Sequence, residues 1–103
     1  MASGKLGGAD LAATTNTTLY TVPASTTASF SVNFANRNTA SVTVRLAIGT
    51  SATPTATDWV IYDTVVDENG SLERTGLVLG AANLVVVYSS TANVTATVYG
   101  YEE

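Results

Sequence analysis

Residues 28–49, ASFSVNFANRNTASVTVRLAIG, decide the fold class of this chain. Apolar side chains alternate with polar ones over residues 28–36 and again over residues 42–48. Side chains of a strand point to opposite faces with period two, so each run presents one apolar face and one mostly polar face. The Asn-rich break at residues 36–39 is typical of a turn. The stretch therefore predicts a β-hairpin with one buried side.

The rest of the chain repeats this alternation. Short apolar runs end at Pro, Gly or Asn clusters about every ten residues, and no run has helical spacing. Gly76 interrupts one run, which indicates a bulge or a close backbone approach. We predict strands over residues 17–22, 28–36, 42–49, 58–66, 71–79, 84–88 and 93–101. This pattern indicates one all-β domain, a single antiparallel β-sandwich of about seven strands, either Ig-like or jelly-roll-like.

The first 16 residues differ from the remainder in composition. They contain three glycines and mostly small side chains, and glycine loses the most backbone entropy on ordering. We therefore predict a flexible N-terminal arm over residues 1–16, with Leu6 and Leu11 as its anchors to a neighbouring protein, and a sandwich domain over residues 17–103. The expected core consists of Tyr20, Phe30, Val32, Phe34, Val44, Leu46, Ile48, Trp59, Ile61, Leu72, Leu84, Val86, Tyr88, Val94 and Val98.

Charge limits the possible partners. The 103 residues include four basic and eight acidic side chains, a net charge of −4, and only 12% of the residues are charged. Scattered basic residues cannot follow a phosphate backbone, so we expect no nucleic-acid partner. No run reaches the roughly 20 apolar residues of a membrane span, so we expect no membrane partner. The weakly charged, Thr-rich surface favours contact with other proteins, and the alternative is a monomer solvated by its hydroxyl groups.

Residues that carry catalysis or bind metals are scarce. The chain has no histidine and no cysteine, which removes the usual base of a serine nucleophile and the usual zinc ligands. The only carboxylate cluster consists of Asp63, Asp67, Glu68 and Glu73. Two of these flank the turn at Asn69 and Gly70, which explains them as solvated turn residues, although a weak surface cation there stays open. We therefore predict no enzymatic activity, no cofactor and no metal site.

Aromatic side chains are candidates for recognition. Tyr99 and Tyr101 alternate with Val98 and would lie on the opposite face of their strand. If exposed, they mark either a subunit contact or, together with Trp59 or Tyr62, a platform on which sugar rings stack. The alternative for each ring is a place in the core.

The arginines are the remaining candidates for contact. Arg45 and Arg74 fall on polar strand faces, and Arg37 follows the Asn-rich break. Each of the first two could pair with an acidic residue within the sheet or across a subunit boundary; the acids considered are Asp58, Asp63 and Glu73. The predicted protein-contact residues are Leu6, Leu11, Arg37, Arg45, Arg74, Tyr99 and Tyr101.

Three segments, residues 6–24, 36–48 and 58–79, together with the closing VYGYEE of residues 98–103, carry a resemblance. In this order they resemble small all-β virion proteins of tailed bacteriophages. The resemblance implies a structural role without enzymatic activity, in a virion assembled in the bacterial cytoplasm. Such proteins occur as capsid decoration (cement) proteins, head fibres, and neck or tail components.

On this basis we expect a capsid decoration protein that binds the major capsid protein or other virion proteins and stabilises the head. We expect a homo-oligomer, with a trimer favoured, whose N-terminal arm becomes ordered on assembly. The alternative is a tail, neck or fibre component that carries a receptor-binding or carbohydrate-binding sandwich.

Overall fold

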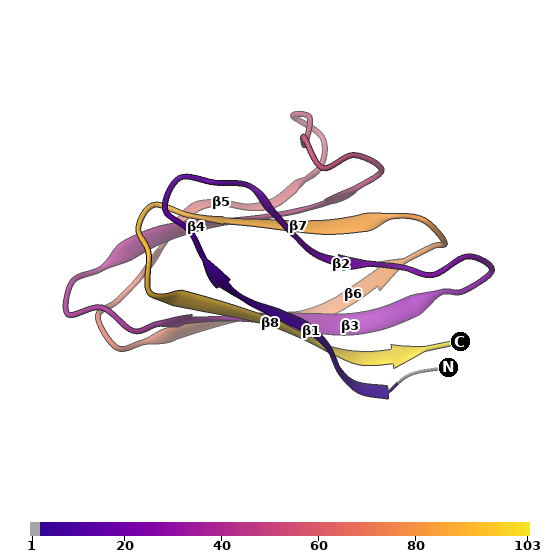
Figure 1. Cartoon of the computed structure of the whole chain (residues 1–103), viewed down its shortest axis with the longest axis horizontal. Helices are drawn as coiled ribbons and strands as arrows, with labels where there is room; N and C mark the ends of the chain where they lie inside the picture. Colours follow the sequence, from indigo (N-terminus) through magenta and orange to yellow (C-terminus); the bar gives the residue numbers. More distant parts are fainter. Residues whose placement is uncertain (1–2) are drawn as a thin grey trace.

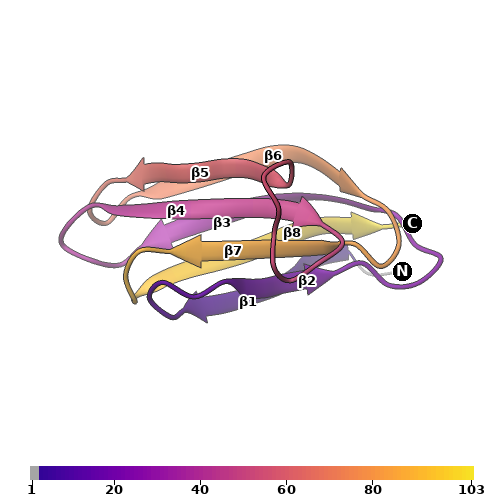
Figure 2. The same ribbon diagram turned by 90° about the horizontal axis from the view of Figure 1, so that it is seen from above.

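The structure, a computed structural model, describes residues 3–103 as two antiparallel sheets of four strands each (Figure 1, Figure 2). The strands are β1 Ser3–Leu11, β2 Thr17–Thr21, β3 Ala28–Asn36, β4 Val42–Gly49, β5 Trp59–Val66, β6 Ser71–Leu79, β7 Leu84–Ser89 and β8 Val94–Glu102. Sheet A has the order β1-β8-β3-β6, and sheet B has the order β2-β7-β4-β5. The predicted all-β, two-sheet class is confirmed, with eight strands instead of seven. Within the described residues no helix could cross a bilayer.

The hairpin predicted over residues 28–49 is wrong, although both of its strands exist. β3 pairs with β6 and β8 in sheet A, whereas β4 pairs with β5 and β7 in sheet B. The chain therefore crosses from one sheet to the other at residues 37–41. Two apolar strand faces can be buried against each other across a core as well as side by side, and alternation alone does not distinguish the two arrangements.

The predicted flexible arm is also wrong over the residues that the structure describes. Ser3–Leu11 form β1, which pairs with β8 from Ser3 opposite Tyr101 to Leu11 opposite Val94. Leu11 is buried in the core and Leu6 packs against it, so both predicted anchors are used within the chain. Composition was misleading because a glycine of this segment, Gly7, permits close packing against β2. A Cβ on Gly7 would lie 2.6 Å from the Leu19 carbonyl oxygen of β2.

The predicted core is confirmed for most of its members. The members buried in it are Tyr20, Phe30, Val32, Phe34, Val44, Leu46, Ile61, Val94 and Val98. Val86 is also buried, but on the outer face of sheet B, because it lies between the core-facing Val85 and Val87. Ile48 and Leu72 are partly buried and pack against this core. Trp59, Leu84 and Tyr88 are only partly buried and lie outside it. In β7 the core-facing residues are Val85 and Val87, so by alternation Leu84 and Tyr88 belong to the outer face of sheet B.

All four edge strands are irregular. β1 and β6 border sheet A, and β2 and β5 border sheet B. The pairing of each edge strand with its neighbour contains a register shift, whereas the central pairs β3–β8 and β4–β7 contain none. The shift in β6 confirms the bulge predicted at Gly76, which has a φ of 75°. Bulges bend an edge strand away from pairing with another chain, so these edges are poorly suited to adding a further strand.

Candidate functional site

The predicted contact residues do not gather in one place. Arg37 forms an exposed ion pair with Asp10 of β1, at 2.5 Å. Arg74 is exposed on the edge strand β6. Arg45 belongs to sheet B, whereas Tyr99 and Tyr101 belong to sheet A. The structure therefore offers two candidate surfaces, one on each sheet.

Arg45 is the centre of the sheet B surface. Its guanidinium carbon lies 4.2 Å from the ring centroid of Tyr62, 4.4 Å from that of Tyr88 and 5.9 Å from that of Trp59. The Trp59 and Tyr62 rings meet edge to face, with centroids 5.2 Å apart. These are the distances of cation–π and aromatic pair contacts, so the rings hold one another in place. We call Arg45, Trp59, Tyr62, Asp63 and Tyr88 the arginine cluster.

Asp63 completes the arginine cluster. The Arg45 Nε donates to Asp63 Oδ1 at 2.6 Å, and an Nη donates to Oδ2 at 3.2 Å, so the pair is bidentate and lies within the chain. Tyr62 and Asp63 together occupy the place opposite Arg45, which bulges β5 and gives Asp63 a φ of 50°. Aspartate tolerates this left-handed conformation better than most residues. The hydrogen bond from Arg45 holds the pKa of the Asp63 carboxyl below its usual value of 3.8.

The Arg45–Asp63 pair makes stability depend on pH. Because the folded pKa of Asp63 is lowered, its contribution is present above the unfolded value of 3.8 and is lost as pH falls through the lower folded value. We expect the difference in free energy of unfolding between the native chain and Asp63→Asn to be constant above about pH 5 and to vanish toward about pH 2. Asn also accepts a positive φ, so the comparison isolates the charge. Urea denaturation across this range measures it, and a difference unchanged at the acid end would contradict the prediction.

Beside the arginine cluster, the β5 side of sheet B is open and apolar. Val65 pairs with Thr43 and is 59% exposed, and Tyr62 is 55% exposed. Both views show the connection between β4 and β5 standing over the outer face of sheet B (Figure 1, Figure 2). The exposed large apolar side chains on this face are those of Tyr62 and Val65, both in β5.

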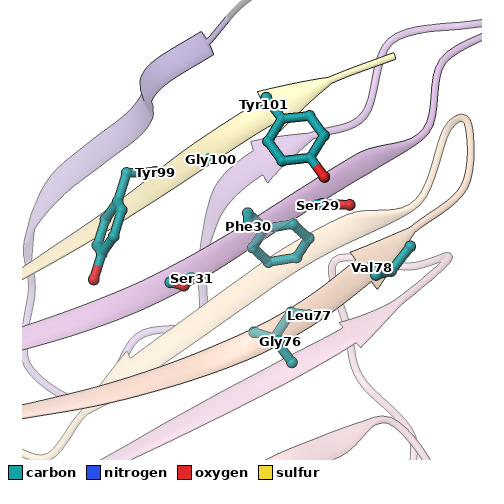
Figure 3. A pocket seen from close by; sticks show the side chains of 9 residues that line it. All are labelled: Ser29, Phe30, Ser31, Gly76, Leu77, Val78, Tyr99, Gly100 and Tyr101. Carbon is teal, nitrogen blue, oxygen red and sulfur yellow. The ribbon is translucent and has the colours of Figure 1, made fainter.

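A groove of about 400 Å³ crosses the outer face of sheet A (Figure 3). Tyr99 and Tyr101 of β8 lie on either side of Gly100, and Val78 of β6 faces them from across β3. The complete lining is Ser29, Phe30, Ser31, Gly76, Leu77, Val78, Tyr99, Gly100 and Tyr101. We call this feature the tyrosine groove.

Strand register builds the tyrosine groove. Ser29 lies between Tyr101 of β8 and Val78 of β6, and Ser31 lies opposite Tyr99. These residues therefore share the outer face of sheet A. Gly100 allows β8 to lie close against β3 between the two rings, because a Cβ there would overlap the Ser29 carbonyl oxygen of β3. The two serines belong to the polar face of the alternating stretch at residues 28–36.

Tyr99 and Tyr101 lie on the face opposite the buried Val98, as predicted, and of the two alternatives left open the structure has Tyr101 49% exposed and Tyr99 partly buried. Trp59 and Tyr62 lie in the other sheet, so the structure does not assemble the aromatics into one platform. Sequence analysis missed Gly76 and Gly100 as parts of a site. Their only signal was glycine within a strand, which is compatible with many other roles.

Within residues 3–103 no group of three acidic side chains is placed to hold a metal ion. Asp63, a member of the predicted carboxylate cluster, forms an ion pair with Arg45. Comparisons with protein-family models, curated proteins and solved structures found no match. The two outer faces are therefore the features from which function is inferred.

Proposed function

We propose that this chain is a structural protein of a bacteriophage virion, without enzymatic activity. Its role would be that of a capsid decoration protein that binds neighbouring subunits of the major capsid protein and stabilises the head. The observation that carries the proposal is the arginine cluster with the exposed Tyr62 and Val65 beside it. Residues that dominate protein–protein affinity are enriched in Trp, Tyr and Arg. Here the rings are already ordered by Arg45, which lowers the entropic cost of binding.

The strand order supports a virion role by analogy. In both sheets, orders β1-β8-β3-β6 and β2-β7-β4-β5, strands from the first half of the chain alternate with strands from the second half. This order and the eight strands favour the jelly-roll-like over the Ig-like alternative. Jelly rolls are common in viral capsid proteins and in lectins. A fold hosts many functions, so this support ranks below that of the arginine cluster.

We also propose that the protein is a closed homo-oligomer, with a trimer favoured. Irregular edge strands disfavour the edge-to-edge pairing of copies. Contacts through the outer face of a sheet can close by symmetry. The low charge of the chain reduces the repulsion between copies.

Two matched valines test the docking proposal. Val65 on sheet B and Val78 on sheet A are each 59% exposed, so the change to Glu has the same chemistry at both. Purified chain is mixed with virions that lack it, and bound chain is measured after sedimentation. We expect Val65→Glu to abolish binding to the capsid, because a charge would be desolvated in the contact. We expect Val78→Glu to bind like the native chain.

Two results would contradict this proposal. If Val65→Glu bound the capsid as well as Val78→Glu, the outer face of sheet B would not be part of the interface. Binding of the native chain to purified tails or necks but not to heads would assign it to the alternative location. In that case the same pair of variants would identify the face used there.

A further inference from the structure

We infer that the tyrosine groove of sheet A binds a neutral saccharide, with a pyranose ring placed between Tyr99 and Tyr101. This site is separate from the docking surface proposed on sheet B. A groove of about 400 Å³ is within the range of small-molecule sites, roughly 300–1,000 Å³. The inference depends on the shape, the polarity and the charge of the lining.

The two tyrosine rings supply the shape. They project from positions two apart on β8, so they stand on the same face with the backbone of Gly100 between them (Figure 3). A pyranose ring has a flat face of C–H groups that stacks on an aromatic ring, while its hydroxyl groups point outward around the rim. Tyrosine suits this role because it combines an apolar face with a polar tip.

Ser29 and Ser31 supply the polarity. They lie opposite Tyr101 and Tyr99 respectively, at the base of the groove. Within residues 3–103 neither serine side chain has a hydrogen bond to the protein, and both residues remain partly accessible. Each hydroxyl can donate one hydrogen bond and accept two, which matches the donor and acceptor pattern of sugar hydroxyls.

The lining determines the charge of the ligand. None of the nine lining residues carries a formal charge at neutral pH. A phosphate, sulfate or carboxylate would lose its hydration there without a counter-charge in the lining, which is unfavourable. Lys5 of β1 lies opposite Tyr99, but its Nζ lies beside Gly8 and outside the lining. A neutral hexose or N-acetylhexosamine loses less hydration free energy, because its hydroxyl groups replace hydrogen bonds to water with hydrogen bonds to the two serines. The groove therefore selects neutral saccharides over acidic ones.

A peptide strand fits the tyrosine groove less well. β3 and β8 are paired on both sides, so their backbone groups are already used. The remaining strand of the groove, β6, is bulged at Gly76 where a peptide would pair. A peptide that adds a strand would therefore meet an interrupted row of backbone hydrogen-bonding groups at β6. A sugar ring that lies across the sheet face does not need such hydrogen bonds.

The experiment titrates the full chain, labelled with ¹⁵N, with maltotriose, mannotriose and chitotriose as neutral probes and with trigalacturonate as the acidic probe. We expect at least one neutral probe to shift the amide signals of residues 29–31, 76–78 and 99–101, with a Kd of about 1 mM. Tyr101→Ala should weaken this binding about tenfold or more, and Tyr101→Phe should retain most of it. Tyr62→Ala is the matched control, because this tyrosine is equally exposed but lies on sheet B. It should bind like the native chain.

Three outcomes would overturn the inference: no shift in these signals with any neutral probe at about 10 mM, a preference for the acidic probe, or shifts that follow protein concentration without sugar. The last would mean that a second copy of the chain fills the groove. The amide spectrum also reports whether each variant is folded. Because Tyr101→Ala should still sediment with virions, loss of saccharide binding and loss of docking are separate results.

Discussion

Asn36→Ala should lower the free energy of unfolding by about 4 kcal/mol, because it removes all the hydrogen bonds that a buried side chain makes to the neighbouring loops. Asn36 ends β3 and is 2% exposed. Its Nδ2 donates to the carbonyl oxygens of Ala40 at 2.9 Å, Val66 at 3.2 Å and Asp67 at 3.0 Å. An alanine would keep the strand but could not satisfy these acceptors.

The side-chain oxygen of Asn36 also holds Asn38, in the loop that connects β3 to β4. Asn36 Oδ1 accepts from both the backbone N and the Nδ2 of Asn38, each at 3.0 Å. Asn38 Nδ2 also donates to the Ala92 carbonyl oxygen at 2.9 Å. Asn36 therefore joins three loops at the end of the sandwich where the chain crosses between sheets. Its loss should loosen the crossing as well as the core.

Asn33→Ala is the control for this prediction. Asn33 lies on β3 but alternates to the outer face of sheet A, where it is only partly buried. We expect its substitution to change the free energy of unfolding by about 0.5 kcal/mol or less. Urea denaturation, with the slope compared among the three chains, measures both effects. Equal losses at the two positions would show that Asn36 does not hold the crossing.

Gly100→Ala should lower the free energy of unfolding by about 3 kcal/mol, because the central strands of sheet A leave no room for a side chain there. A Cβ on Gly100 would overlap the Ser29 carbonyl oxygen and lie 2.6 Å from the Phe30 Cα. Both are backbone atoms of β3, so relief requires β3 and β8 to move apart. The same movement would distort the tyrosine groove.

Gly80→Ala tests whether the effect belongs to this position. The nearest atom to a Cβ on Gly80 is Asn83 Nδ2, at 3.9 Å, which is an ordinary contact. We expect its effect on the free energy of unfolding to be within about 0.5 kcal/mol. Thermal and urea denaturation compare the two variants. A small loss for Gly100→Ala would indicate that the strands separate easily and that the groove is not rigid.

Prediction from sequence succeeded where a property depends on neighbouring positions. The strand over residues 28–36 and the placement of Tyr99 and Tyr101 on the face opposite Val98 both follow from period-two alternation. The bulge at Gly76 follows from a glycine in an otherwise regular strand. Each of these is a local feature, so local reasoning was sufficient.

Prediction failed where the partner of a residue is distant. Arg45 was assigned a choice of acidic partners, and only the bulge of β5 brings Asp63 within hydrogen-bond distance. Trp59 was expected in the core because both faces of its strand are apolar, but it lies against Arg45 on the outer face. Leu11 was placed in a mobile arm because the glycines before it suggested conformational freedom, whereas Leu11 is buried and Gly7 allows β1 to pack closely against β2.

Sequence alone established an all-β chain and most of its core, because burying one face of a strand requires only that apolar residues recur at every second position. It could not establish that residues 28–36 and 42–49 enter different sheets, nor that Tyr20 of β2 donates a hydrogen bond to Glu102 of β8. The arginine cluster and the tyrosine groove likewise appear only in the folded chain. Strand pairing and face-to-face packing join residues far apart in sequence, and their energies depend on the whole set of contacts at once.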